Sequence, residues 1–222
     1  MESAESLLVR ESDRLVLLFE PPFDHQEPNP GYIRGYPPGM RENGGQYTHG
    51  ALWMAMAWAR MGEGDRAMRL LQMMNPIELA RTPQDVEKYA AEPYVVAADV
   101  SSAPGRAGRA GWTWYTGSAA WMYRIWIEEV LGFQLRGDRL TMKPAMPGCW
   151  DNFSLTYRHG STVYEIAVER HEESGMVTEM DGAVVEDGSI RLSDTGGTRR
   201  IRVGIPHVLA QNEEPESRLA KV

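Results

Sequence analysis

The chain has 222 residues, of which 42% are hydrophobic and 24% are charged, a composition typical of globular proteins with a sizeable core. Its formal net charge of -8 argues against a general nucleic-acid binder, because affinity for polyanions comes mainly from Lys and Arg. Cys149 is the single cysteine, which excludes an intrachain disulfide and a cysteine-based zinc cluster.

The lack of a recognisable export signal or membrane span predicts a cytoplasmic location. The first residues, MESAESLLVRESDR, carry acids where a signal peptide has a basic region. No later segment approaches the ~20 consecutive apolar residues of a membrane span. The five His residues are scattered along the chain, so we predict no metal site.

The first half of the chain predicts helices separated by long loops. Residues 51–61, ALWMAMAWARM, are apolar nearly all round, which indicates a helix buried on most sides that ends at Gly62. Asp65 can cap a second helix over 65–75, with Ala67, Leu70, Leu71 and Met74 on one face.

Two further segments complete the predicted helical half. The segment PYVVAADV is ambiguous between helix and strand. A last helix begins near Ser118, is apolar through Trp121, Ile125 and Val130, and ends at Gly132.

Beyond Gly132 the pattern changes to alternating apolar residues with frequent turns, which predicts antiparallel strands. We expect hairpins about Gly137-Asp138 and about His159-Gly160, then short strands separated by Asp-Gly and Gly-Gly turns. The predicted organisation is a helical part over 1–132, a β-sandwich over 133–206 and a flexible tail over 207–222.

The long loop from Pro21 to Tyr47 is a candidate binding segment, since loops of this length are mostly functional or disordered. Within and just after it, RENGGQYTH concentrates Arg41, Glu42, Gln46 and His49 before a buried helix. Such donors and acceptors suit a hydroxyl-rich ligand. The alternative is that Arg41 and Glu42 form a structural ion pair and that His49 caps the helix.

A second candidate site is GWTWYTGSAAW, where Thr116 and Gly117 precede the last helix. Free amides at a helix start attract anions, and glycine lets an oxyanion approach the backbone. The alternative for Thr116 is an ordinary helix cap. The aromatic residues before it could line a sugar subsite or fill a core: Trp112, Trp114 and Tyr115.

The carboxylates of EPYVVAADV, Glu92 and Asp99, could bind hydroxyls or act in proton transfer, but single acids near a proline are usually loop residues. The sequence contains no phosphate-binding P-loop, no dinucleotide-binding turn and no nucleophile elbow. These residues alone therefore leave the reaction open.

Three segments together resemble the cellobiose phosphorylase family of inverting glycoside phosphorylases: GYIRGYPPGMRENGGQYTHGALW, EPYVVAADV and GRAGWTWYTGSAAWMYR. Within it, the likeness is greatest to the phosphorylase-like region of cyclic β-1,2-glucan synthases and to β-1,2-oligoglucan phosphorylases. The similarity extends to about residue 206 and includes KPAMPGCWDNFSLTYRHGSTVYEI. The resemblance implies the closing helices of an (α/α)6 barrel followed by a C-terminal antiparallel β-sandwich.

The resemblance also implies roles for individual residues. His49 corresponds to the family's phosphate-binding histidine, and Thr116 with Gly117 to its phosphate-binding Thr-Gly pair. Arg41 and Glu42 correspond to a pair that contacts the acceptor sugar. The remaining sugar-site residues are Gln46 and Glu92, the latter in a motif near the family's active site.

Two departures from the family pattern matter. The family's general-acid Asp lies in an upstream Gly-Asp-Trp-Asn-Asp type motif that this sequence lacks, and Asp24, Asp65 and Asp99 are not in that context. The run SSAPGRAGRAG differs from the more aromatic or His-containing loop that the family leads us to expect. We therefore expect a C-terminal part of the enzyme that cannot turn over alone.

The resulting hypothesis is that the chain is part of a β-glucan phosphorylase or of a glucan synthase. Its expected substrate is β-1,2-linked glucan. It binds a β-glucan oligosaccharide and inorganic phosphate as co-substrate, with no other cofactor and no nucleic acid. A companion chain or barrel segment would cover the apolar face of 51–61 and supply the acid. In a full-length glucan synthase this part would lie at the cytoplasmic face of the inner membrane. Two alternatives remain: an inverting hydrolase, and a non-catalytic glucan-binding or scaffold module.

Overall fold

The computed structural model describes residues 1–25, 27–92, 94–114, 116–172 and 175–207. The chain forms two compact units, Met1–Pro147 and Gly148–Val222, which we describe separately. The helices of the first unit are α1 Glu2–Leu8, α2 Thr48–Arg60, α3 Gly64–Met74, α4 Pro83–Tyr89 and α5 Ser118–Arg124, with the 3-10 segments η1 Glu11–Asp13, η2 Gly31–Gly35 and η3 Glu78–Ala80 and the π-helical η4 Ile125–Val130.

The strands of the first unit are short. They are β1 Val9–Arg10, β2 Leu15–Val16, β3 Gln46–Tyr47, β4 Asp99–Val100, β5 Phe133–Arg136 and β6 Arg139–Met142. They pair antiparallel as β1 with β2, β3 with β4, and β5 with β6. The β3–β4 pair joins the long loop to the segment that was ambiguous in sequence, and part of that segment is therefore a strand.

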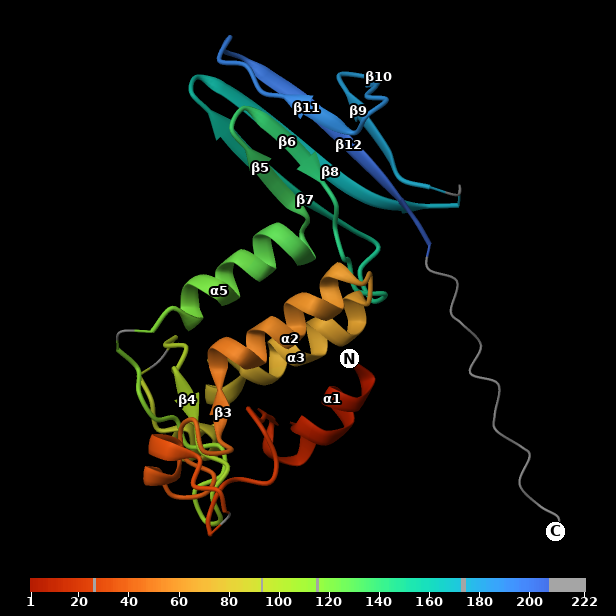
Figure 1. Ribbon diagram of the computed structural model, residues 1–222. Coiled ribbons are helices and arrows are strands. Elements are labelled where there is room, and N and C mark those ends of the chain that lie inside the picture. Colours follow the sequence, from red (N-terminus) through yellow and green to blue (C-terminus); the bar gives the residue numbers. More distant parts are fainter. Residues whose placement is uncertain (26, 93, 115, 173–174, 208–222) are drawn as a thin grey trace, which may run out of the picture. The chain divides into compact units, whose positions relative to one another are not determined.

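Helices α2 and α3 pack against each other across a tight turn (Figure 1). The turn contains Gly62, whose φ of 85° lies in the left-handed region that glycine adopts without strain. The predicted apolar face of α3 is confirmed, since Ala67, Leu70 and Leu71 are fully buried and Met74 nearly so. The predicted cap is wrong: the N-cap residue is Glu63, and Asp65 lies in the first turn.

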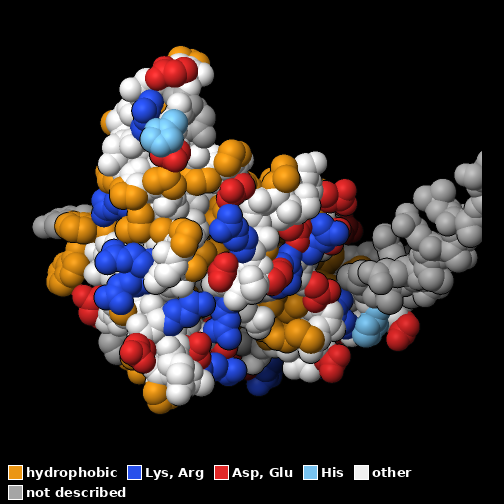
Figure 2. Space-filling view, turned by 90° about the horizontal axis from the view of Figure 1, so that it is seen from below, with side chains coloured by type: hydrophobic (Ala, Val, Ile, Leu, Met, Phe, Trp, Pro, Cys, Tyr) orange, Lys and Arg blue, Asp and Glu red, His pale blue; other side chains and the backbone are white. Residues whose placement is uncertain are grey.

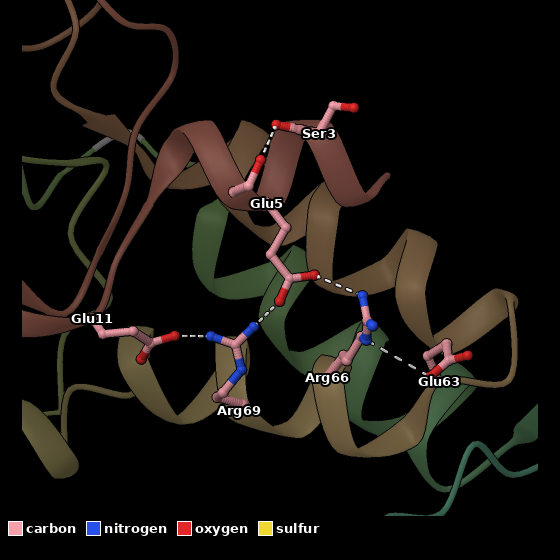
Figure 3. Close-up of polar contacts among 7 residues, drawn as sticks. Ser3, Glu5, Glu11, Glu63, Arg66 and Arg69 are labelled. Carbon is pink, nitrogen blue, oxygen red and sulfur yellow. Dashed lines mark hydrogen bonds and ion pairs between the residues drawn. The ribbon is translucent and has the colours of Figure 1, made fainter. Parts of the chain in front are cut away.

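Helix α1 is attached to α3 by an ion-pair network that centres on Glu5 (Figure 3). One Glu5 oxygen lies 3.2 Å from Arg66 Nη1, and the other accepts a hydrogen bond from Arg69. Arg69 also pairs with Glu11. Only 17% of the Glu5 side chain is exposed, whereas the Glu11 side chain is 62% exposed, so the shielding from solvent is confined to the centre of the network.

Helix α4 was not predicted, although its start carries a cap signal. The hydroxyl of Thr82 accepts a hydrogen bond from the Asp85 amide at 3.1 Å, and Pro83 occupies the first turn. The helix buries only Tyr89. Tyr89 joins a small core with Leu15, Leu17, Ala97 and Val100.

The last helical segment comprises α5 and η4, and Gly132 follows it with φ of 68°. The predicted hairpin about Gly137-Asp138 is confirmed as β5 and β6, with Arg136 opposite Arg139. The change from helix to strand thus lies at Gly132, whereas the first compact unit continues through Pro147. The described helices do not close into a barrel, and the (α/α)6 architecture stays an expectation from the resemblance.

The second unit is built on a five-stranded sheet with the order β10-β9-β12-β8-β7 (Figure 1). Its strands are β7 Asn152–His159, β8 Thr162–His171, β9 Val177–Met180, β10 Ala183–Val184, β11 Ser189–Arg191 and β12 Thr198–Pro206, of which β11 lies outside this sheet. The hairpin predicted about His159-Gly160 is confirmed as β7 and β8. Alternate residues are buried from Thr162 to Val168 in β8 and from Ile201 to Ile205 in β12.

The prediction of purely antiparallel strands is wrong for this sheet. Strand β12 runs parallel to β8, with Thr198 opposite Val163 and Pro206 opposite His171. A parallel neighbour needs a crossover, and the chain from β8 to β12 passes through β9, β10 and β11 before it returns. The sheet is therefore mixed. Most of the predicted tail, 208–222, lies outside the described residues.

None of the helices in the described ranges has the length and apolar character that a membrane crossing requires. The described ranges also contain no cluster of three or more His, Cys, Asp or Glu side chains arranged to hold a metal ion.

The turn between β7 and β8 is tied to Asp194. The hydroxyl and the amide of Ser161 both donate to Asp194 Oδ1, at 2.5 and 2.7 Å. These bonds, the hydroxyl foremost, hold the pKa of Asp194 below its ordinary value. The contribution of Asp194 to stability is therefore present above its unfolded-state pKa and lost as pH falls through the lower folded-state pKa.

We expect Ser161→Ala to raise the pKa of Asp194 toward its ordinary value, because the hydroxyl bond disappears while the amide bond remains. A carboxyl-carbon NMR titration of Asp194 measures the change. Ser154→Ala, on the exposed face of β7, is the control and should leave the Asp194 midpoint in place. An unchanged midpoint in Ser161→Ala would contradict the assignment.

Candidate functional site

The structure brings His49 and Gly117 together from two distant segments. His49 lies in the first turn of α2, and Gly117 is the N-cap residue of α5. A Cβ added to Gly117 would lie 2.8 Å from His49 Cε1 and 3.1 Å from Nε2. The imidazole therefore lies directly against the Gly117 backbone. Gly117 is exposed and His49 half-buried, so a solute can reach both.

Thr116 organises the start of α5. Its Oγ1 accepts a hydrogen bond from the Ser118 amide at 3.0 Å and lies 2.7 Å from Ser118 Oγ. The capping alternative considered for Thr116 is thus realised in part. If Ser118 donates its hydroxyl proton to Thr116, then the Thr116 hydroxyl proton is available to an anion.

Aromatic rings surround His49. The His49 ring lies 6.2 Å from Tyr47 at an interplanar angle of 18°, and it meets Trp53 and Trp121 edge to face at 6.0 and 6.3 Å. Trp53 and Trp121 also pack on each other, at 5.8 Å. These two residues were missed as site residues, although His49 and Trp53 are four apart and so share one face of the helix. The rings limit where the imidazole can move.

A concavity of about 230 Å³ lies beside this cluster, and two predicted sugar-site residues line it. Its lining consists of Arg41, Glu42, Tyr47, Ala98, Asp99 and Trp112. Tyr47 both lines the concavity and stacks on His49, so one ring connects the two parts of the site. Asp99 and Trp112 had been considered from sequence but not assigned.

Arg41 is held in an uncommon backbone conformation, with φ of 48°. Its guanidinium lies over the rings of Tyr36 and Trp112, 5.8 and 5.6 Å from their centroids. Its Nη2 lies 3.9 Å from Asp99 Oδ1. The alternative in which Arg41 forms a structural ion pair with Glu42 finds no support among the ion pairs of the described residues, where Arg41 faces Asp99 instead.

Glu42 contributes a carboxylate whose second oxygen is unsatisfied. Its Oε2 is buried and has no hydrogen-bond partner in the described part of the chain. A buried carboxylate oxygen without a donor is costly. A ligand hydroxyl entering the concavity would supply such a donor.

Gln46, predicted as a sugar contact, is not among the residues that line the concavity. Its side chain is 2% exposed, and its Oε1 accepts a hydrogen bond from the Val16 amide at 3.0 Å. Its Nε2 donates to Thr48 Oγ1 at 3.4 Å. The amide thus ties β2 to the start of α2 and has no surface left for a ligand.

Glu92 is exposed and lies outside the concavity lining. Its Oε1 accepts a long hydrogen bond from the Thr113 hydroxyl, at 3.5 Å. Glu92 thus contacts the neighbour of Trp112 but is not part of the concavity lining that contains Arg41 and Glu42.

The exposed aromatic residues of the second motif favour ligand contact over core packing. Trp112 is 49% exposed and Trp114 is 69% exposed, while Tyr115 lies outside the described residues. On the face drawn in Figure 2, hydrophobic side chains lie among Lys, Arg and acidic side chains. Exposed ring faces beside hydrogen-bonding groups are typical of surfaces that bind sugars.

Comparison with known proteins places these features in a family. Residues 1–132 match the glycosyl hydrolase 94 superfamily, catalytic domain. The cyclic beta-(1,2)-glucan synthase NdvB of Rhizobium meliloti is 46% identical over 175 residues, which are 79% of this chain and 6% of the synthase. The N,N'-diacetylchitobiose phosphorylase of Vibrio furnissii is 31% identical over 140 residues, 63% of this chain and 17% of that enzyme.

A third relative is the solabiose phosphorylase of Paenibacillus borealis, 28% identical over 191 residues, 84% of this chain and 24% of that enzyme. The chain thus spans between 6% and 24% of the length of these relatives. Because the family match covers residues 1–132, more than half of the chain, the protein belongs to the glycosyl hydrolase 94 superfamily.

Proposed function

We propose that this chain supplies the phosphate and acceptor-sugar contacts of an inverting phosphorolysis site that acts on β-glucan, with β-1,2-linked glucan as the first substrate to test. The observation that carries the proposal is the contact of the His49 ring with the exposed Gly117 backbone at the start of α5.

Phosphate would be held by three kinds of donor. The His49 imidazole supplies a ring N–H, and Thr116 supplies a hydroxyl. The third kind of donor is the backbone amides in the first turn of the helical segment 118–130, which an anion can approach because Gly117 has no side chain. Gly117 has φ of -83°, so its value here is the missing side chain rather than an unusual conformation. The aromatic rings around His49 fix the imidazole in place.

The acceptor sugar would occupy the concavity. The Arg41 guanidinium supplies donors, Glu42 Oε2 an unsatisfied acceptor, and the Trp112 and Tyr47 rings apolar faces. Phosphate and sugar would then lie on opposite sides of Tyr47, which contacts both parts of the site. Gln46 has no part in this proposal, and Glu92 would act only if a ligand extends beyond the concavity.

In the proposed reaction a phosphate oxygen attacks the anomeric carbon from the face opposite the leaving oxygen, and a carboxylic acid protonates that oxygen. The C–O bond to the acceptor breaks as the C–O bond to phosphate forms. The chain's own residues position the nucleophile and the leaving sugar. The acid would come from a further segment or a companion chain, which would also cover exposed apolar side chains such as Trp53 and Tyr123. We place this activity in the cytoplasm.

Calorimetric titration of the 222-residue chain with a short β-1,2-linked glucose oligosaccharide, with and without inorganic phosphate, tests the proposal. We expect phosphate to increase sugar affinity about threefold to tenfold, because the two ligands share Tyr47 and its neighbours. Chloride at equal ionic strength is the control.

Sugar binding that is indifferent to phosphate would contradict the proposal and favour a non-catalytic glucan-binding module. In a reconstituted enzyme, release of free sugar without a sugar 1-phosphate would favour an inverting hydrolase instead.

A further inference from the structure

We infer that Asp99 is a positioning residue for the proposed acceptor-sugar pocket, and that it orients the Arg41 guanidinium and the Trp112 segment. The inference rests on the proposed function for the meaning of the pocket. The contacts of Asp99 with Arg41 and with Trp112 lie within the first unit.

Asp99 is built into the floor of the concavity. It lies in β4 directly opposite Tyr47 of β3, so the register of a two-residue strand pair places both side chains at the pocket. Asp99 is 4% exposed. A carboxylate buried to this extent needs hydrogen bonds or opposite charge nearby.

The first partner is the backbone of the aromatic segment. Asp99 Oδ1 accepts a hydrogen bond from the Trp112 amide at 2.9 Å, and the Asp99 carbonyl accepts one from the Gly111 amide at 2.9 Å. A Cβ on Gly111 would lie 2.1 Å from Asp99 Oδ2, so only glycine fits there. The carboxylate therefore fixes where Trp112 stands at the pocket edge.

The second partner is Arg41. Its Nη2 lies 3.9 Å from the same Oδ1, and its guanidinium lies over the rings of Tyr36 and Trp112. The Arg41 side chain is 36% exposed. An exposed arginine normally samples many rotamers. Here one carboxylate and two rings lie close enough to restrict the positions of the guanidinium beside the proposed sugar site.

A purely structural role and a positioning role predict different results. Asn at position 99 keeps the acceptor for the Trp112 amide and the size of the side chain, but it removes the charge that faces Arg41. A structural role would thus tolerate Asp99→Asn. A positioning role would not, because Arg41 loses the charge that orients it.

The test uses the 222-residue chain and two measurements. The first is the Nε–Hε NMR signal of Arg41 without ligand, which we expect to shift and broaden in Asp99→Asn at an unchanged melting temperature. The second is calorimetric titration with the β-1,2-linked glucose oligosaccharide, where we expect about fivefold weaker binding. The double variant with Arg41→Gln should bind like Arg41→Gln alone, because the effect of Asp99 acts through Arg41.

An unchanged Arg41 signal, or affinity losses that add in the double variant, would overturn the inference. Should Asp99→Asn not fold, Asp99→Glu takes its place, since it keeps the charge but moves the carboxylate, and the same shift of the Arg41 signal is expected. If the wild-type chain binds no oligosaccharide, the proposed function fails, whereas the ligand-free Arg41 signal still decides the positioning role.

Discussion

Gly117→Ala is expected to weaken binding of inorganic phosphate about thirtyfold, or ~2 kcal/mol, without unfolding the chain. The added methyl group would lie 2.8 Å from His49 Cε1, closer than carbon atoms approach in proteins. The imidazole must then move away, but Tyr47, Trp53 and Trp121 leave it little room. The methyl group also occupies the place from which an oxyanion reaches the amides.

Backbone strain should not contribute to the effect of Gly117→Ala, because alanine readily adopts the φ of -83° found at position 117. Gly35→Ala is the matched control, since a Cβ there meets nothing within 4 Å, and it should bind phosphate like the wild type. Calorimetric titration measures both affinities. In a His49→Ala background, Gly117→Ala should cost less affinity than in the wild type, because only the obstruction of the amides then remains.

Phosphate affinity that survives Gly117→Ala would show that the anion does not bind between His49 and α5. An equal loss in Gly35→Ala would show that the effect is global. Either result would separate the observed contact from the proposed phosphate site.

The sequence predicted those parts of the fold that depend on neighbouring residues. The helix over 51–61 follows from a continuous apolar run, and the hairpins follow from turn residues such as Gly160. Helix α4 was not predicted from the sequence, because PQDVEKY has no helical period of apolar residues and buries only Tyr89. The parallel pairing of β12 with β8 was also not predicted. Turn residues indicate which consecutive strands form hairpins, but they do not indicate which strand pairs with β12 after a crossover.

The candidate site divides in the same way. Helix-start chemistry indicated Thr116 and Gly117, but the contact with His49 was expected only through the family resemblance. The sequence places Gln46 just before a helix but does not reveal that its side-chain oxygen already accepts a hydrogen bond from the Val16 amide. Asp99 became informative only when its carboxylate was seen to face Trp112 and Arg41 at once.

One buried side-chain amide, that of Asn43, makes three hydrogen bonds within the long loop. Asn43 is 0% exposed, its Oδ1 accepts a hydrogen bond from the Phe23 amide at 2.7 Å, and its Nδ2 donates to the carbonyls of Phe23 and Tyr36 at 2.8 and 2.7 Å. These three bonds connect the start of the loop, at Phe23, and its middle, at Tyr36, to the residue that follows Arg41 and Glu42. The Asn43 side chain therefore connects the segment of the binding residues to two other parts of the loop.

We expect Asn43→Ala to lower the free energy of unfolding by about 3 kcal/mol, because it removes three bonds and leaves buried backbone groups unsatisfied. Asn43→Asp should be at least as damaging at neutral pH, since its carboxylate would face two carbonyl oxygens. Asn29→Ala is the matched control in the same loop: its exposed Oδ1 accepts one bond from Gly31, and its loss should cost less than about 0.5 kcal/mol. Denaturant unfolding followed by near-ultraviolet circular dichroism measures all three.

The same variant separates the two parts of the proposed site. Under conditions where Asn43→Ala remains folded, sugar affinity should fall more than phosphate affinity, because Arg41 and Glu42 lie in the loop while His49 lies in α2. Equal losses for both ligands would mean that the loop also supports the phosphate contacts. Wild-type stability in Asn43→Ala would mean that the packing of the loop, and not the Asn43 amide, determines its shape.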